Sequence, residues 1–150
     1  MRELNKGYVE ELFKKIEEYY GVKVDEKIIK NYKFFINNDN KIYIFNKNFP
    51  SKIIDEKIIK NRGLYIMRIE RGNIIRFSIE GAQLFGIESK RIIEIKKEKL
   101  FYLSEENKKI EVDVEDGYYI AKDGKDILGS VYVKNKELKD FIPKDRKIKL

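Results

Sequence analysis

The amino-acid sequence predicts an α+β protein with a mixed or antiparallel sheet. Near the N-terminus, apolar residues recur at intervals of three and four, which is typical of an amphipathic helix. Further along, several short runs rich in β-branched and aromatic residues are joined by turn signals. These runs do not alternate with long helices, so a βαβ series is not expected.

The first element expected is a helix that begins after Asn5 and ends at Gly21. Asn5 is a good N-cap residue, and a glycine commonly ends a helix in the left-handed conformation. The apolar stripe of this helix consists of Val9, Leu12, Phe13, Ile16, Tyr19 and Tyr20. The opposite side is rich in Glu and Lys, and we interpret it as solvated.

Two hairpins and a short helix are expected next. Residues 32–37 and 41–46 flank Asn and Asp residues that tolerate turn conformations. Residues 64–69 and 73–77 flank an Arg-Gly turn, and Ser78 can cap a short helix that runs to a glycine at position 86. Between the hairpins, residues 52–60 are compatible with a short helix and almost equally with a strand.

The remaining chain is expected to form a second, β-rich portion. Residues 91–95 and 110–114 alternate like strands, and residues 97–103 fit one or two helical turns. We therefore divide the chain into an N-terminal α/β portion, residues 1–86, and a C-terminal portion, residues 87–150.

The C-terminal portion contains the clearest hairpin of the sequence. Residues 118–121 and 127–133 are rich in β-forming residues, and Asp123-Gly124 is a tight-turn signal between them. Gly129 interrupts the second run. An interior glycine of this kind indicates a β-bulge or a close backbone approach, either by a packed helix or by a bound chain.

Several classes of chemistry are excluded or disfavoured by composition. The chain has no Cys and no His, which removes disulfides, thiol catalysis, His-based general bases and the usual zinc sites. The glycines fit no phosphate-binding loop, and neighbouring carboxylates lie near turn signals without any sign of a cleft. We expect no cofactor, no metal and no catalytic activity.

The sequence offers some expectations about location. No apolar run approaches the roughly 20 residues that a transmembrane helix needs, so we expect a cytoplasmic protein without a membrane partner. Abundant Lys and Glu are typical of thermophile proteins, whereas the many Asn residues are not.

A basic excess favours a nucleic-acid partner. The net charge is +7 and the pI is about 9.3, and Lys or Arg side chains that neutralise phosphates release counterions. A solvated surface with surplus lysine is the alternative. The candidate nucleic-acid-binding residues, which become RNA-binding residues if the resemblance described below holds, are Arg71, Arg76, Arg91, Lys134, Lys136, Lys139, Lys144, Arg146 and Lys147. Tyr118, Tyr119 and Tyr132 are candidates for stacking on unpaired bases, or alternatively for the core.

The C-terminal stretch resembles a known RNA-binding domain. The matching residues are Gly124, Gly129, Leu138, Lys139, Pro143, Lys144 and Arg146. In this pattern the chain is similar to the end of the PUA-like domain that closes many Fmu/Sun-type ribosomal RNA cytosine-5 methyltransferases. Residues 63–86 are similar to the strand, turn, strand and short helix that precede it. No catalytic residue carries over, because a methyltransferase needs a separate cofactor-binding domain.

The whole layout also resembles a small ribosome-biogenesis family of archaea and eukaryotes. The opening helix and the hairpin that ends in KIYIFNKN are similar in order and length to the N-terminal part of that family. The resemblance implies a mixed α/β pre-PUA portion followed by a small PUA-like β pseudobarrel. The C-terminal portion is shorter than a full PUA domain, so a trimmed barrel is expected.

The resemblance also implies a function. It predicts binding to structured RNA, ribosomal or transfer, in ribosome biogenesis or RNA modification, with an RNA-modifying enzyme or a ribosome-assembly protein as a further partner. The alternative is a protein-interaction subunit that gives specificity to a separately encoded RNA-modifying enzyme.

Overall fold

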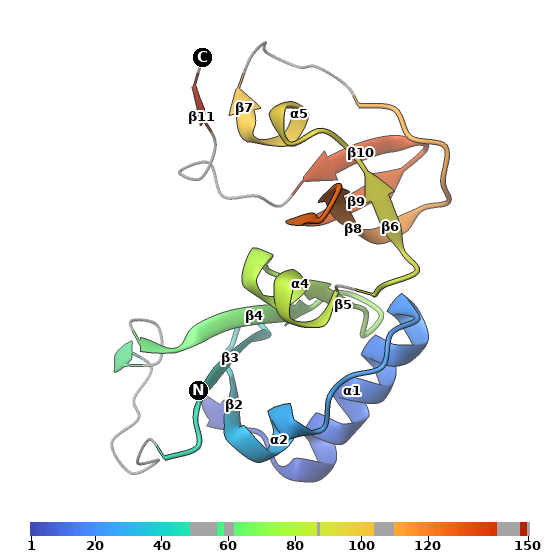
Figure 1. Ribbon diagram of the computed structural model, residues 1–150. Helices are drawn as coiled ribbons and strands as arrows, with labels where there is room; N and C mark the ends of the chain where they lie inside the picture. Colours follow the sequence, from blue (N-terminus) through green and yellow to red (C-terminus); the bar gives the residue numbers. More distant parts are fainter. Residues whose placement is uncertain (49–56, 59–61, 87, 104–109, 141–147, 150) are drawn as a thin grey trace.

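The protein has an α+β architecture with two principal sheets, as the sequence predicts (Figure 1). The structure is a computed structural model, and it describes residues 1–48, 57–58, 62–86, 88–103, 110–140 and 148–149. Most of the segment expected as helix or strand at residues 52–60 lies outside these ranges.

The first sheet is an antiparallel meander of five strands. In spatial order these are β1 (Arg2–Glu3), β2 (Tyr32–Ile36), β3 (Lys41–Asn46), β4 (Leu64–Ile69) and β5 (Ile75–Phe77). Both predicted hairpins are present. The turns between their strands contain residues with positive φ, namely Asn40 in the first hairpin and Gly72 and Asn73 in the second. Asn and Gly reach this conformation at low cost, which explains the turn positions.

The predicted N-terminal helix is α1 (Lys6–Tyr20), and it packs on one face of the first sheet. The side chain of Asn5 accepts a hydrogen bond from the Tyr8 N–H, and Gly21 ends the helix with φ 66°. The buried stripe is Val9, Leu12, Phe13, Ile16 and Tyr20. A short helix that the sequence analysis did not predict, α2 (Lys27–Asn31), leads into β2.

The second predicted helix, α4 (Ile79–Phe85), lies directly on β4 of the first sheet. The hydroxyl of Ser78 accepts a hydrogen bond from the Gly81 N–H and donates one to the Tyr65 carbonyl. A Cβ atom at Gly81 would lie 1.7 Å from the Ile66 carbonyl oxygen. Only glycine therefore permits this crossing of helix and strand.

The second sheet has four strands and is not a closed barrel within the described residues. Its order is β10 (Glu137–Asp140), β9 (Asp126–Lys134), β8 (Gly117–Asp123) and β6 (Ile92–Glu94), with β6 parallel to β8. A separate parallel pair joins β7 (Tyr102–Leu103) and β11 (Ile148–Lys149).

Two predicted elements of the C-terminal portion differ from the observed ones. Residues 97–103 divide into a short helix, α5 (Lys97–Phe101), and strand β7. Residues 110–114 make a single bridge, Glu111 to Glu137, instead of a full strand. Alternation alone predicts exposure of every second side chain, but it does not supply a partner strand.

The predicted C-terminal hairpin is confirmed as β8 and β9. Gly124 has φ 59° and occupies the first position of a two-residue turn. The pairing shifts register opposite Gly129, which has φ 142°, so the glycine marks a β-bulge as expected. Strand β10 was not predicted. It follows a second two-residue turn at Asn135 and Lys136, which both have positive φ.

The two sheets share their packing through α4 (Figure 1). Ala82 and Phe85 of this helix belong to the core under the first sheet, and Ile79 belongs to the core of the second. Ile120 of β8 belongs to the first core. The division expected between residues 86 and 87 falls just after α4.

Among the helices of the described residues, none is long and apolar enough to cross a membrane.

Candidate nucleic-acid interface

A pair of tyrosines lies where the second sheet approaches the first. The rings of Tyr118 on β8 and Tyr132 on β9 have centroids 4.8 Å apart and planes tilted by 54°. The two residues are directly opposite each other in the antiparallel pairing, and both side chains are half-buried. Each of the two tyrosines is therefore partly packed and partly accessible to solvent.

The backbone of Tyr118 is held from both sides. Its N–H donates a hydrogen bond of 2.9 Å to the Tyr19 hydroxyl, and its carbonyl accepts one of 2.9 Å from the Arg91 side chain. Gly117 precedes it with φ 143°, and a Cβ atom there would lie 2.5 Å from the Arg91 guanidinium. The sequence therefore fixes the position of the tyrosine pair through a glycine and two side chains.

Arg91, a predicted RNA-binding residue, lies between aromatic rings. Its guanidinium carbon is 4.3 Å from the Tyr19 ring centroid and 4.4 Å from that of Tyr119. Such contacts are favourable because the ring faces carry negative partial charge. Arg91 thus joins α1 to β8. Tyr119 is 8% exposed and belongs to the second core, so its packed alternative is the one observed.

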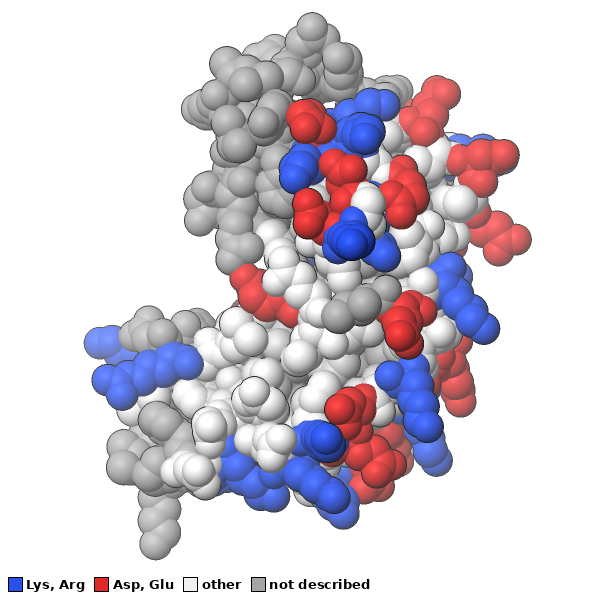
Figure 2. All heavy atoms as spheres, in the orientation of Figure 1, with Lys and Arg blue, Asp and Glu red and all other residues white. Residues whose placement is uncertain are grey.

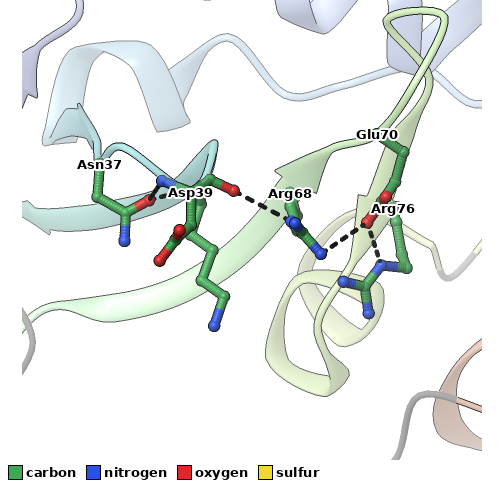
Figure 3. A network of polar contacts seen from close by, with 6 residues as sticks. Asn37, Asp39, Arg68, Glu70 and Arg76 are labelled. Carbon is green, nitrogen blue, oxygen red and sulfur yellow. Dashed lines mark hydrogen bonds and ion pairs between the residues drawn. The ribbon is translucent and has the colours of Figure 1, made fainter.

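An arginine cluster of the first sheet surrounds one carboxylate (Figure 3). Glu70 accepts a 2.8 Å hydrogen bond from Arg76 and lies 3.6 Å from a guanidinium nitrogen of Arg68. Arg68 also donates to the Asp39 carbonyl, at the turn that the Asn37 side chain organises. Two guanidinium groups face one carboxylate, which leaves a net positive charge in the cluster.

Arg76 of this cluster lies on β5, which contacts β9, the strand that carries Tyr132. Burial raises the pKa of Tyr118, the Glu70 carboxylate raises it further, and the Arg76 guanidinium lowers it. Both charges are therefore near enough to act on the phenol. The fold brings Arg76, predicted from one part of the chain, beside the C-terminal hairpin predicted from another.

The lysines on the other side of the pair are exposed. Lys139 of β10 is directly opposite Tyr132, and Lys134 lies two residues beyond Tyr132 on β9, so both are on the same face of the sheet. Neither forms an ion pair among the described residues. Their charges are available to a ligand.

Lys136 has a different environment from Lys134 and Lys139. It lies in the turn before β10 with φ 62° and forms an ion pair with Asp113. The hydrogen bond from Lys136 lowers the pKa of Asp113. Both groups are fully exposed, so solvent and salt screen the pair strongly.

The other predicted residues are distributed as follows. Arg71 is exposed in the β4–β5 turn. Lys144, Arg146 and Lys147 lie outside the described residues. Arg68 was not among the candidate RNA-binding residues, but it pairs directly with Arg76 across β4 and β5, so the two arginines lie on the same face of the first sheet.

The charges of the molecule are mixed. On the face drawn in Figure 2, Lys and Arg lie among Asp and Glu over the upper part of the molecule. Among the described residues of that face, positive and negative charges are therefore interspersed, and a local group such as the tyrosine pair with its neighbouring cations is the candidate for recognition of a polyanion.

We name the surface formed by Arg68, Arg76, Tyr118, Tyr132, Lys134 and Lys139 the tyrosine face.

The described residues contain no group of three or more carboxylates placed to hold a metal ion. In comparisons with known proteins, no family model and no curated protein matches the chain.

Proposed function

We propose that the protein is a non-catalytic RNA-binding protein and that it binds RNA through the tyrosine face. The observation that carries this proposal is the half-buried Tyr118–Tyr132 pair, with Arg76 on one side and, on the other, Lys134 and Lys139, which form no ion pair among the described residues. Aromatic rings bordered by cations are the combination that unstacked bases and their phosphates require.

The chemistry of RNA suits each part of this face. Base stacking on an aromatic side chain contributes about 1–3 kcal/mol per base and tolerates any sequence. Lysines such as Lys134 and Lys139 contact phosphates as point charges, whereas the planar guanidinium of Arg76 suits two-point contacts. Loops and bulges of structured ribosomal or transfer RNA present unstacked bases beside ordered phosphates, so they are the ligand class we favour.

The proposal includes a PUA-like assignment of the C-terminal portion, with the N-terminal portion as its pre-PUA partner. Support comes from the β8–β9 hairpin with Gly124 and Gly129 at positive φ, and from the strand, turn, strand and helix order of β4, β5 and α4. A role in ribosome biogenesis or RNA modification in the cytoplasm follows from that assignment.

The proposal is tested by measuring affinity for a defined RNA hairpin with an unpaired loop at several salt concentrations. The logarithm of the affinity is expected to fall with the logarithm of salt, by about 0.7 to 0.9 for each neutralised phosphate. The double variant Lys134→Glu with Lys139→Glu is expected to weaken binding and to flatten this slope. Tyr132→Leu is expected to weaken binding to the hairpin more than to its stem alone.

Two lysines elsewhere provide the control. Lys27 and Lys30 are exposed on α2, which lies away from the second sheet (Figure 1), and the variant Lys27→Glu with Lys30→Glu makes the same change in net charge. Equal loss of affinity in both double variants, or no binding at low salt, would sink the proposal.

The alternative function is that of a specificity subunit for a separate RNA-modifying enzyme. An apolar groove lined by Tyr32, Leu64 and Leu84 favours a protein partner in addition to RNA. A pull-down before and after nuclease treatment separates the two functions, since a direct protein contact survives nuclease.

A further inference from the structure

The exposed large apolar side chains of the described residues gather in one place. They are Tyr32 at the start of β2, 37% exposed, Leu64 at the start of β4, 44% exposed, and Leu84 on α4, 39% exposed. All three line the same groove, which has a volume of about 530 Å³. Single exposed apolar residues are normal on a protein surface, but a contiguous set marks an interaction site.

The groove exists because the helices cover only part of the first sheet. Ile44 and Leu64 pair across β3 and β4, and Tyr32 pairs with Asn46 at the end of β2. Ile44 is buried in the first core, whereas the side chains nearer the strand ends are not covered. Leu84 and neighbouring residues of α4 form the other wall. In Figure 2 an uncharged surface, drawn white, extends over α4 and the strands beside it.

The charges at the rim indicate the sign of the partner. Arg62 is exposed, lines the groove and has no ion-pair partner among the residues described. Glu80, by contrast, already takes part in an interaction within the protein. Arg62 is therefore the rim charge with which an acidic group of a partner can pair.

A second copy of the chain suits this groove poorly. The protein carries a net charge of +7, so two copies repel each other, and Arg62 at the rim, which has no ion-pair partner among the described residues, is itself positive. A segment with an apolar stripe and flanking carboxylates complements both the apolar lining of the groove and the positive charge of Arg62. An amphipathic helix presents such a stripe to an open groove.

We propose that this groove binds an acidic amphipathic helix of a partner protein. The apolar stripe of the helix lies against Tyr32, Leu64 and Leu84, and a carboxylate at its edge pairs with Arg62. Two leucines and a tyrosine at the centre exclude water, while Arg62 at the rim selects the acidic sequence. The site is separate from the tyrosine face and does not depend on RNA binding.

Three synthetic peptides test the proposal. The first is a helical peptide with a leucine stripe flanked by glutamates, the second has the same composition in scrambled order, and the third carries lysines in place of the glutamates. Affinity is measured by fluorescence anisotropy, and the methyl resonances of Leu64 and Leu84 report the place of binding. Only the leucine–glutamate peptide is expected to bind and to shift both leucines.

Variants of the protein sharpen the test. Leu84→Glu is expected to weaken binding of the leucine–glutamate peptide by about tenfold or more. Arg62→Glu is expected to move the preference toward the lysine peptide. Arg71 is an exposed arginine in the β4–β5 turn. The variant Arg71→Glu is the matched control and should leave peptide affinity unchanged.

Several outcomes would overturn the proposal. These are equal binding of the scrambled peptide, no binding of the leucine–glutamate peptide, and affinity that Leu84→Glu leaves unchanged in a variant with an intact thermal transition. Concentration-dependent dimerisation that Leu84→Glu abolishes would instead identify a second copy as the occupant and refute the acidic helix.

Discussion

At the residue scale, a buried tyrosine makes stability depend on alkaline pH. The Tyr20 side chain is fully buried, and its hydroxyl donates a hydrogen bond to the Ile75 carbonyl. Burial raises the pKa of this phenol above its ordinary value of 10.0. The folded protein therefore keeps a proton that the unfolded chain loses, so stability is intact below about pH 10 and falls as pH rises beyond it.

Tyr20→Phe tests this account. We expect a loss of about 1–2 kcal/mol at neutral pH, because the Ile75 carbonyl loses its partner. Above pH 10 the free energy of unfolding should fall less steeply with pH in the variant than in the wild type. The two slopes should differ by about 1.4 kcal/mol per pH unit, the contribution of one titrating group. Denaturant unfolding at several pH values measures both effects.

A second tyrosine serves as the control for this experiment. Tyr32→Phe removes a hydroxyl from an exposed side chain and should leave stability at neutral pH unchanged. Parallel curves for wild type and Tyr20→Phe above pH 10 would contradict the assignment.

Single residues also show the limit of reading function from sequence. From the sequence, Arg91 was interpreted as one cation of a basic stretch that also contains Lys90, Lys96 and Lys97. Its guanidinium contacts the rings of Tyr19 and Tyr119 and the backbone carbonyl of Tyr118, and all three residues come from positions far away in the sequence. Composition and spacing do not reveal such a site, whereas the stripe of α1 was readable because it is local.

At the element scale, two helical glycines should respond in opposite ways to the same substitution. A Cβ at Gly7 of α1 would meet only the Asn5 side chain, at 3.5 Å, whereas one at Gly81 of α4 would meet the Ile66 carbonyl at 1.7 Å. Gly7→Ala should stabilise the protein by up to about 1 kcal/mol through helix propensity. Gly81→Ala should destabilise it by about 1–3 kcal/mol or more, because α4 must move off β4.

Thermal unfolding of the two variants measures this contrast. Helix propensity alone would make both substitutions stabilising. A difference in sign between the two variants therefore shows that packing of α4 on β4 outweighs helix propensity at Gly81. A stabilised Gly81→Ala variant would mean that α4 does not cross β4 closely.

The turn between β9 and β10 contains a strained lysine. Lys136 has φ 62°, a conformation that glycine adopts freely and other residues at a cost. Lys136→Gly creates an Asn-Gly turn, the preferred pair for such hairpins, and should stabilise the protein by about 0.5–1 kcal/mol. The ion pair with Asp113 that it removes is exposed and contributes little.

A lysine in the neighbouring hairpin provides the matched comparison. Lys125 occupies the second position of the β8–β9 turn and does not have positive φ. Lys125→Gly should therefore give no gain in melting temperature. A gain of similar size in both variants would contradict the strain at Lys136.

Strand β10 was hard to predict from the sequence. Its residues, Glu137–Asp140, are mostly charged, and charged residues are uncommon in strands. The strand forms because the Asn135–Lys136 turn returns the chain along β9. The hairpins at residues 32–46, 64–77 and 117–134 were predictable because β-forming runs flank Gly or Asn turns.

At the scale of the whole molecule, the sequence predicted the α+β class and most elements, but not how its basic clusters meet. Arg76 and Tyr118 are far apart in the chain and close in the fold. The apolar groove was not predicted either, since Tyr32, Leu64 and Leu84 come from three separate elements. Long-range contacts of this kind leave no periodic pattern in a single sequence.

The two proposed surfaces predict independent binding. Arg62→Glu should change peptide preference without affecting RNA affinity, and the double variant at Lys134 and Lys139 should affect RNA alone. Each surface thereby serves as the control for the other.

The central claim is that RNA binds at the tyrosine face, and chemical-shift mapping with the RNA hairpin tests it most directly. Titration of isotope-labelled protein at low salt should shift the resonances of Tyr118, Tyr132 and Lys139 first and most strongly. The resonances of α2, including Lys27, should not move. Shifts concentrated on α2 or spread evenly over the surface, or no shifts at all, would contradict the account.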